Sequence, residues 1–600
     1  MRRFWGGTSW VQRWLVAVVM LAPIAVALLS VADPPAVGYA APPRTPVSVY
    51  PTPGDTYEMP GTQISFRGVA PSQMGSMTVR GSRTGLHTGR LLPHSDGRGA
   101  SFVPARGFAP GERVTVTTEL NIVGGMRGQF SFAIEHPAGG LPGEKLPRAR
   151  RGQYVNHFRS VPGLVPASLQ VTRNRTPDSD GDIFVAPQFG PIQNGPMIVD
   201  PHGNLVWFDP IAITSNMLAT DFRAQTLFGH KVLTWWQGVT NAGSGSGVGV
   251  ILGQNYQPVG LVRAANGLAM DLHEFMVTNQ GDAWIIAIAP MRLPGIGRNV
   301  QNGVVQEIDI RTGLVLFQWD GMDHVPPSWS YRWGSKIRGR VLGPWHINSV
   351  SLDAGGNPVV SMRNMNAVYD INRSTGKINW ELGGKHSSFK MGPGTSTVFQ
   401  HDAIIHPGNQ ITVFDDGAGP PRVHTQSRGI RIALNTKRHT SRLIQVYAHD
   451  PPISANYEGS IQPLPHDNVF LGWGQQPFVS QDTGDGTEDF GATFPSGTTS
   501  YRAYRFRWSG QPVTPPSVAL DDGKGNALTV YVSWNGATDV ARWRVLTGGS
   551  RAALQPGPTA AKQHFETAIS LHTSAAYIAV QALDSHGQVL ATSVPQPRPG

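Results

Sequence analysis

The sequence predicts an all-β protein: a six-bladed β-propeller flanked by an N-terminal β-sandwich and a C-terminal fibronectin-III/Ig-like β-sandwich. Short runs that alternate apolar and polar residues recur along the chain, separated by turns rich in its 71 Gly and 49 Pro. The hydrophobic content of 40% is high enough for folded cores. A strand–turn–strand unit repeats through the middle of the chain, and 600 residues are too many for one core.

The composition excludes several classes of chemistry. The chain has no Cys, so disulfides, thiolate catalysis and Cys-based metal sites are absent. The net charge is +10, but the basic residues are scattered and no groove-reading motif is present. We therefore expect no nucleic-acid partner.

Residues 1–42 have the features of a targeting segment. Arg2, Arg3 and Arg13 precede an apolar run over residues 14–32, and small residues follow up to Ala41. This order is typical of a secretory signal peptide, and the apolar run is also long enough for an N-terminal membrane anchor. We expect export, with the product either secreted or attached to the membrane through residues 14–32.

Residues 44–137 are predicted to form the N-terminal β-sandwich, because alternating runs are separated by Gly and Pro clusters. Residues 138–160 are rich in Pro, Gly and basic residues and are predicted to be a linker. Residues 515–597 contain further alternating runs and are predicted to form the fibronectin-III-like sandwich, with a structural or adhesive role.

Residues 161–512 contain the repeat. A strand, a turn with Asp or Gly, and a second strand ending in Trp recur, as in Ile198–Trp207 and Ile308–Trp319. Anchoring positions near 200, 253, 309, 370 and 434 are 53 to 64 residues apart, a spacing that suits four-stranded propeller blades. A further blade fits between Phe470 and Trp508, which makes six.

A second repeat places three histidines in equivalent positions. His273, His346 and His401 each open an apolar strand that leads through a Gly turn into another apolar strand. The first strand of each propeller blade lines the central channel, so equivalent positions converge near its mouth. Arg363 ends the strand that returns from the His346 turn and comes back to the same end.

Two kinds of site fit this convergence. Three imidazoles can hold Zn or Cu. An adjacent Arg is repelled by a metal dication, whereas Arg with neutral His suits an oxyanion such as sulfate or phosphate. The sequence favours the oxyanion site, with no metal and no cofactor.

The ordered motifs of this region resemble the arylsulfate sulfotransferase (arylsulfotransferase, ASST) family. The similarity covers roughly residues 160–512 and departs at Asp402, where better-studied members have another residue. The matching motifs are His273–Phe275, Trp345–Val350, Ser361–Arg363, Trp380–Lys385, Phe399–Ala403, Phe414–Gly417, Ser427–Gly429 and Ser500–Tyr504.

The resemblance implies transfer of a sulfuryl group from an aryl sulfate donor to a phenolic acceptor, without a nucleotide sulfate donor. It implies a sulfohistidine intermediate on His401, supported by His273, His346, Asn348 and Arg363. In that mechanism Arg363, His346 and Asn348 contact the sulfuryl oxygens, and His273 is a candidate for proton exchange with the phenol. The assignment of acid and base among the three histidines stays open. Tyr501 and Arg502 are candidates for binding the aromatic donor, with a structural role as the alternative.

Two other functions are compatible with the sequence. One is a non-catalytic exported propeller that binds glycans, aromatics or a protein partner. The other is a metal-dependent hydrolase or oxidase built on the three histidines. The natural donor and acceptor and the oligomeric state are not encoded in any pattern that we can interpret.

Overall fold

A computed structural model describes residues 45–138, 155–177, 180–190, 193–212, 216–241, 243–292, 299–333, 343–419 and 421–599. The predicted targeting segment 1–42, with its possible membrane attachment through residues 14–32, lies outside the described residues. So do residues 139–154 of the predicted linker.

The chain is nearly all-β, as predicted. Helix in the described part is limited to α1 (Gly321–His324) and the 3-10 turns η1 (Pro71–Gln73), η4 (Pro327–Trp329), η5 (Arg363–Met365) and η6 (Pro465–Asp467). None of the described helices is long and apolar enough to cross a membrane.

Two sheets near the N-terminus share one apolar core, which includes Phe66, Phe102, Val116 and Phe132. Arg113–Thr118 and Gln129–Ala133 contribute alternate side chains to that core, in agreement with the period-2 pattern of the sequence. The first sheet contains β5 (Gly89–Pro93), β6 (Gly99–Pro104), β2 (Ile64–Arg67), β1 (Pro46–Tyr50) and β8 (Asn121–Ile122). The second contains β4 (Gly85–His87), β3 (Met77–Gly81), β7 (Arg113–Thr118) and β9 (Gln129–Ala133).

The middle of the chain forms antiparallel sheets in which each strand pairs with the next one in sequence. The first half of one large sheet contains β16 (Leu218–Leu227), β17 (His230–Asn241), β18 (Ser244–Gly253) and β19 (Pro258–Val262). The second half contains β20 (Ala269–Val277), β21 (Asp282–Arg292), β22 (Asn299–Asp309) and β23 (Val315–Asp320). A bridge between β18 and β20 joins the two halves. The next sheets are β24 (Ile347–Leu352), β25 (Pro358–Met362), β26 (Ala367–Ile371), β27 (Ile378–Gly383), and then β28 (His401–His406), β29 (Gln410–Asp415), β30 (Arg428–Asn435), β31 (Thr440–Tyr447).

The last sheets of this region join its two ends. β32 (Ser460–Pro463), β33 (Val469–Gly472), β34 (Phe478–Asp482) and β35 (Glu488–Thr493) take up β10 (Gln170–Asn174) at their outer edge. β36 (Thr499–Phe506) pairs with β11 (Asp182–Gln188), which is followed by β13 (Met197–Val199) and β14 (Leu205–Phe208); β12 (Gln193–Asn194) pairs with β15 (Ile211–Ala212).

This arrangement corrects one detail of the sequence interpretation. The single blade predicted between Phe470 and Trp508 is divided, because β36 forms backbone hydrogen bonds with β11 over 300 residues earlier in the chain. The alternating pattern of a segment identifies it as a strand but does not identify the strand with which it pairs. Periodicity therefore could not reveal the pairing of β36 with β11.

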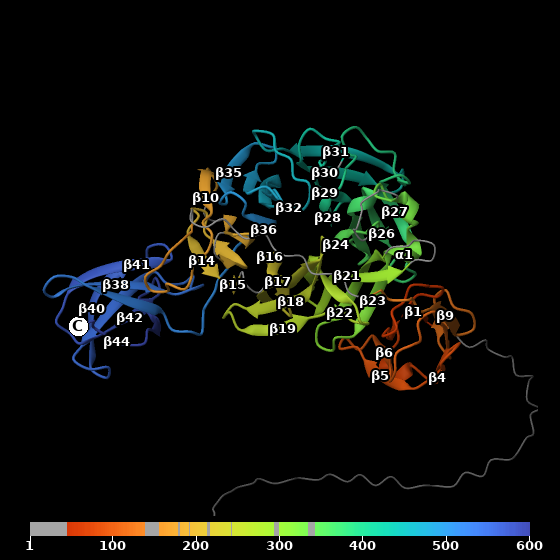
Figure 1. Ribbon diagram of the computed structural model, residues 1–600, viewed down its shortest axis with the longest axis horizontal. Coiled ribbons are helices and arrows are strands. Elements are labelled where there is room, and N and C mark those ends of the chain that lie inside the picture. The colour runs from red at the N-terminus through yellow and green to blue at the C-terminus, as the bar shows by residue number, and fades with distance from the viewer. Residues whose placement is uncertain are drawn as a thin grey trace, which may run out of the picture. The chain divides into compact units, whose positions relative to one another are not determined.

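The first strands of successive sheets lie next to one another around a common centre (Figure 1, where β36, β16, β24, β28 and β32 are labelled). A polar side chain on each of β16, β20, β24, β28 and β32 accepts a hydrogen bond from a backbone N–H of the next strand around the centre. The acceptor and donor residues are Asp221 and Phe275 (2.8 Å), Glu274 and Val350 (3.2 Å), Ser349 and Ala403 (3.0 Å), Asp402 and Ile461 (2.9 Å), and Ser460 and Ala503 (3.0 Å).

Arg502 on β36 neutralises the carboxylates at this centre. Its Nη1 lies 3.0 Å from Asp221 and 3.2 Å from Glu274, and its Nε lies 3.6 Å from Asp402. Its Nη2 donates to the carbonyl oxygen of Asn348 at 2.9 Å. One buried guanidinium therefore connects residues from four other strands.

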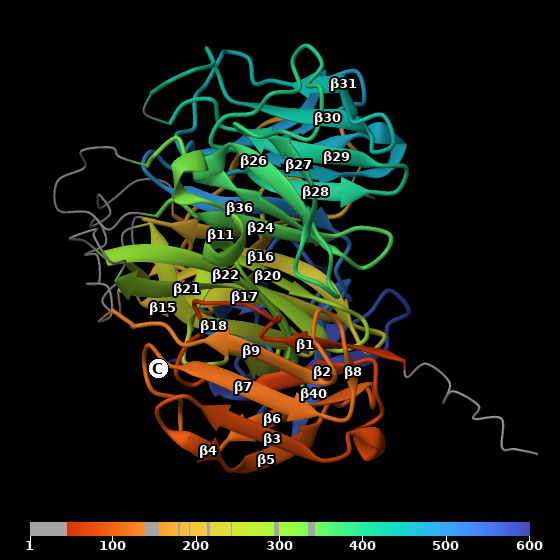
Figure 2. The same cartoon turned by 90° about the vertical axis from the view of Figure 1, so that its right-hand side faces the viewer.

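The C-terminal region forms two further sheets with a core that includes Val532, Trp543, Val545 and Val580. The first has β37 (Ser517–Asp522), β38 (Ala527–Ser533) and β41 (Glu566–His572). The second has β40 (Leu554–Ala561), β39 (Arg542–Gly548), β42 (Tyr577–Leu583), β43 (Val589–Thr592) and β44 (Gln596–Pro597). Figure 2 shows the N-terminal strands β1, β2, β7 and β9 from a second side. The predicted domain boundaries stay predictions.

We expect Arg502→Met to lower the free energy of unfolding by about 3–5 kcal/mol, because buried Asp402 loses its ion-pair partner while Asp221 and Glu274 keep Arg223. Denaturant titration followed by tryptophan fluorescence measures this loss. The control is Arg598→Met, which removes the more exposed pair with Asp522 and should cost less than about 1 kcal/mol. A loss below about 1 kcal/mol in Arg502→Met would show that the central cation does not stabilise the fold.

Candidate active site

The three histidines predicted to converge come from three neighbouring first strands. His273 lies in β20, His346 directly precedes β24, and His401 is the first residue of β28. The rings of His273 and His346 meet edge to face, with centroids 4.6 Å apart. Both rings also lower the pKa of His401. The structure therefore brings all three imidazoles into one site.

His401 has a defined tautomer. Its Nδ1 lies 2.6 Å from Oδ2 of Asp416, and the backbone N–H of Glu458 donates to its Nε2 at 3.3 Å. Burial raises the pKa of Asp416, which favours a proton shared within the His–Asp pair. Since a backbone N–H can only donate, Nε2 must be the unprotonated nitrogen and the proton lies on the Nδ1 side. The lone pair of Nε2 is thus directed away from Asp416.

The environment keeps His401 neutral. Burial lowers its pKa well below the usual value of 6.5, and the positive charge of Arg363 lowers it further. A neutral imidazole with an available Nε2 lone pair is a nucleophile at neutral pH.

The other two histidines are held differently. Nδ1 of His273 forms a short hydrogen bond with Asp271, whose other oxygen accepts from the backbone N–H of Gly245 at 2.6 Å. Burial lowers the pKa of His346 well below its usual value, and His273 and Arg363 act in the same direction. His346 is therefore a neutral hydrogen-bond donor or acceptor, and His273 belongs to a second His–Asp pair.

Arg363 supplies the positive charge of the site. It begins the turn η5, and its backbone N–H donates to the carbonyl oxygen of His346 at 2.9 Å. Its guanidinium lies over the ring of Phe399, 4.7 Å from the ring centroid, and its Nη2 donates to the carbonyl oxygen of Asn456 at 2.7 Å. These contacts fix the guanidinium near the neutral histidines, an arrangement that favours an oxyanion.

Asn348 lies in the site, and its side-chain nitrogen donates to the protein backbone. Its Nδ2 donates to the carbonyl oxygen of Gln400 at 2.7 Å, and its buried Oδ1 has no hydrogen-bond partner among the described residues. The side chain thus positions the residue before His401. Direct donation from Asn348 to a sulfuryl oxygen stays a prediction.

Tyr501 and Arg502 are both fully buried. Tyr501 packs edge to face on His273, with centroids 5.5 Å apart, and its hydroxyl donates to the carbonyl oxygen of Asn348 at 3.4 Å. Arg502 uses its guanidinium in the central ion pairs, and its side chain has 0% relative exposure. This burial favours the structural alternative for Arg502, and contact of Tyr501 with a donor stays a prediction.

Three residues that contact the histidines were given no role by the sequence motifs: Asp416, Asp271 and Glu458. Asp416 belongs to the quoted Phe414–Gly417 motif, so its proximity to His401 could have been considered. Asp271 precedes His273 by two residues, a spacing that places both side chains on one face of a strand. Glu458 follows a loop without regular pattern, and no signal in the sequence points to it.

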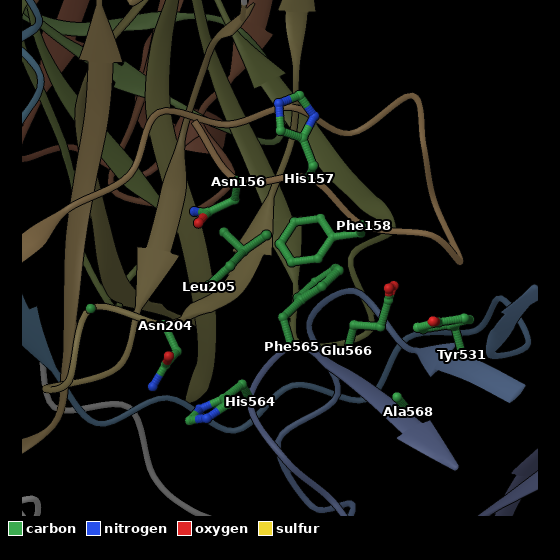
Figure 3. A pocket seen from close by; sticks show the side chains of 11 residues that line it. Asn156, His157, Phe158, Asn204, Leu205, Tyr531, His564, Phe565, Glu566 and Ala568 are labelled. Atoms are coloured by element: carbon green, nitrogen blue, oxygen red, sulfur yellow. The ribbon is translucent and has the colours of Figure 1, made fainter. Parts of the chain in front are cut away.

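The described residues contain no group of three or more His, Asp or Glu side chains arranged to hold a metal ion. A separate cavity of about 320 Å³ lies elsewhere, lined by Phe158, Leu205, Tyr531, Phe565 and their neighbours (Figure 3). None of the three histidines lines this cavity.

Comparison with known proteins agrees with the sequence motifs. Residues 223–495 match the family model described as arylsulfotransferase (ASST). No curated protein matches the chain significantly.

Solved structures show only distant likeness. A protein of unknown function from Bacteroides caccae has 11% identity, covers 54% of this chain and 99% of its own, and has a TM-score of 0.35. A streptogramin B lyase has 12% identity, with 60% and 93% covered and a TM-score of 0.29. An inactive virginiamycin B lyase from Staphylococcus aureus has 9% identity, with 53% and 96% covered and a TM-score of 0.24. Scores this low carry no conclusion about fold or function.

The family match includes all three histidines, Arg363 and both His–Asp pairs. The predicted resemblance is thereby confirmed, and residues 223–495 form an arylsulfotransferase-family region.

Proposed function

We propose that this protein transfers a sulfuryl group from an aryl sulfate to a phenol through a sulfohistidine at His401, without a nucleotide sulfate donor. The family match supports sulfotransferase-like activity in general. The observation that carries the specific proposal is the geometry of His401. Asp416 holds its Nδ1, its Nε2 is unprotonated and accepts a hydrogen bond from the Glu458 N–H, and Arg363 is the leading charge that acts on the ring.

In the first half-reaction, Nε2 of His401 attacks the sulfur of the donor. The N–S bond forms as the S–O bond to the aryl group breaks, and the electron pair leaves with the phenolate. Asp416 accepts the Nδ1–H hydrogen bond and stabilises the positive charge that develops on the imidazole. The carboxylate therefore acts on the nucleophile and needs no contact with the substrate.

Charge on the sulfuryl oxygens requires donors placed before the reaction begins. Arg363 supplies a cation, and His346 supplies a neutral imidazole beside it. The N–H of Glu458 donates to Nε2 in the resting site at 3.3 Å. Once Nε2 is bonded to sulfur, this N–H loses its acceptor and lies close to the sulfuryl oxygens.

In the second half-reaction, a phenol attacks the sulfohistidine and His401 leaves as a neutral imidazole. The acceptor phenol must lose its proton in this half-reaction, and the leaving phenolate gains a proton in the first half-reaction. His273 is the candidate from the sequence for this exchange, and a hydrogen bond with Asp271 orients its ring.

We also propose the finer architecture. The ring of first strands β36, β16, β20, β24, β28 and β32 supports six propeller blades, with the paired sheets at either end as the predicted sandwiches. Export and membrane attachment through residues 14–32 are part of the proposal and rest on the sequence alone.

We expect a peptide containing His401 to gain the mass of one sulfuryl group when the protein is mixed with 4-nitrophenyl sulfate and no acceptor. His401→Gln should abolish this adduct and reduce transfer by roughly 10³-fold or more. Intact and peptide mass spectrometry at neutral pH measures the adduct. The matched control is His406→Gln, at the other end of β28, which should keep both the adduct and the transfer. An unchanged rate in the His401 variant would contradict the nucleophile assignment.

The lowered pKa of His401 predicts the pH dependence of transfer. Protonation inactivates the nucleophile, so a pKa well below 6.5 keeps kcat/KM constant on the acid side until the pH falls well below 6.5. Arg363→Ala removes the leading charge that lowers this pKa and should move the acid limb to higher pH.

The same variant should lose about 10²–10³ in kcat, because a cation at the sulfuryl oxygens is gone. Profiles of kcat/KM against pH with 4-nitrophenyl sulfate test both effects. An acid limb at the same pH in wild type and variant would show that Arg363 does not act on the nucleophile.

A further inference from the structure

One carboxyl group next to the nucleophile has no function in the steps above. Glu458 lies between β31 and β32, and its backbone N–H contacts the reacting Nε2 of His401 at 3.3 Å. Its Oε2 is buried and has no hydrogen-bond partner among the described residues. A buried carboxyl oxygen without a partner costs stability, so the fold gains nothing from it.

The backbone at Glu458 is held in a fixed, strained conformation. Its φ is +70°, in the left-handed region that non-Gly residues rarely adopt. The next residue, Gly459, has φ +108°, and a Cβ there would lie 2.4 Å from the ring of Phe414. Gly459 N also donates to the carbonyl oxygen of Tyr501 at 3.1 Å. The turn therefore holds the Glu458 backbone in place beside His401.

The preceding residues are fixed as well. Arg363 donates to the carbonyl oxygen of Asn456, two residues before Glu458. The Glu458 charge acts on Asp416, which holds His401, and on Tyr501, which packs on His273. The carboxyl thus lies within electrostatic reach of Asp416 and Tyr501, and the backbone N–H of the same residue contacts the atom that bonds to sulfur.

We propose that Glu458 is the catalytic residue that exchanges the phenol proton: its carboxylic acid protonates the departing phenolate, and its carboxylate then deprotonates the acceptor phenol. The inference rests on the proposed sulfotransfer function and replaces His273 in the proton transfers of both half-reactions. The proton balance closes over one cycle, because the proton given to the first phenol is recovered from the second.

The protonation state of the group fits this role. Burial raises the pKa of Glu458 to about 8, so the resting site at neutral pH holds the carboxylic acid. The titratable groups within reach of its charge are Asp416, Tyr457 and Tyr501. His401 contacts its backbone N–H, and Arg363 binds the same turn at the carbonyl oxygen of Asn456. The phenolate of a phenol with a pKa near 10 is a poor leaving group unless it is protonated as it departs. In the second half-reaction, the carboxylate must take a proton from the acceptor phenol.

The test compares donors that differ in their need for a proton. With phenyl sulfate, whose phenolate is a poor leaving group, Glu458→Gln should reduce transfer by about 10²-fold or more. With 4-nitrophenyl sulfate, whose phenolate leaves without help, the first half-reaction should change little. In wild type the rate with phenyl sulfate falls as the pH rises through about 8, and the variant lacks this fall.

Glu381→Gln is the matched control. Glu381 is another buried carboxyl, in β27, and burial raises its pKa to about 7, but it contacts Tyr369 and not His401. This variant should keep the leaving-group dependence of wild type. His273→Gln is the competing variant: if it alone loses phenyl sulfate selectively, His273 carries the proton and the Glu458 proposal is wrong.

A second measurement needs no turnover. A pKa raised from 4.5 to about 8 means that the folded state binds the proton more tightly than the unfolded state, so stability falls as the pH rises from about 4.5 to 8. Glu458→Gln lacks this loss, and its Tm relative to wild type should increase between pH 5 and pH 9. A constant difference in Tm would overturn the assigned protonation state.

The outcomes separate this inference from the proposed function. If wild type forms the sulfohistidine but Glu458→Gln affects both donors equally, or neither, the proton-exchange role fails and sulfotransfer stands. If wild type transfers from neither donor and forms no adduct, the sulfotransferase proposal fails, and the Glu458 role fails with it.

Discussion

The centre of this protein depends on one recurring contact, in which a polar side chain on the first strand of a sheet accepts a backbone N–H from the first strand of the next sheet. Asp221, Glu274, Ser349, Asp402 and Ser460 each make it. Backbone groups at the inner edges of separate sheets would otherwise be buried without partners, which is costly. The contact satisfies them and sets the register between neighbouring sheets.

The positions of these contacts also explain how the histidine side chains reach the imidazole cluster. The strand pairing is irregular at these positions, between Met270 and Phe275 and between His401 and Ile404. Such an irregularity changes the direction of successive side chains. Glu274 and Asp402 can therefore bind the neighbouring strand while His273 and His401, one residue earlier, join the imidazole cluster. Asp402 serves the scaffold through Ile461 and Arg502.

Much of the fold and part of the site followed from the sequence. Alternating apolar residues located the strands, and repeat phase identified His273, His346 and His401 as equivalent positions because periodicity reports which way a side chain faces. It does not report partners. The pairing of β36 with β11, the ion pairs of Arg502 and the contact of Glu458 with His401 join residues that are far apart in sequence. These long-range relations required the three-dimensional structure.

The position of Arg502 near the end of the ring has a consequence for synthesis. Asp221, Glu274 and Asp402 are translated long before the guanidinium that neutralises them, and the strand that carries it closes the ring against β11. Until that strand has been made, Asp221 and Glu274 can pair with Arg223, but Asp402 lacks the guanidinium that it faces in the folded ring. Burial of a carboxylate without a cation is costly, so we expect the centre, with its imidazole cluster, to be completed only when nearly the whole ring has been made.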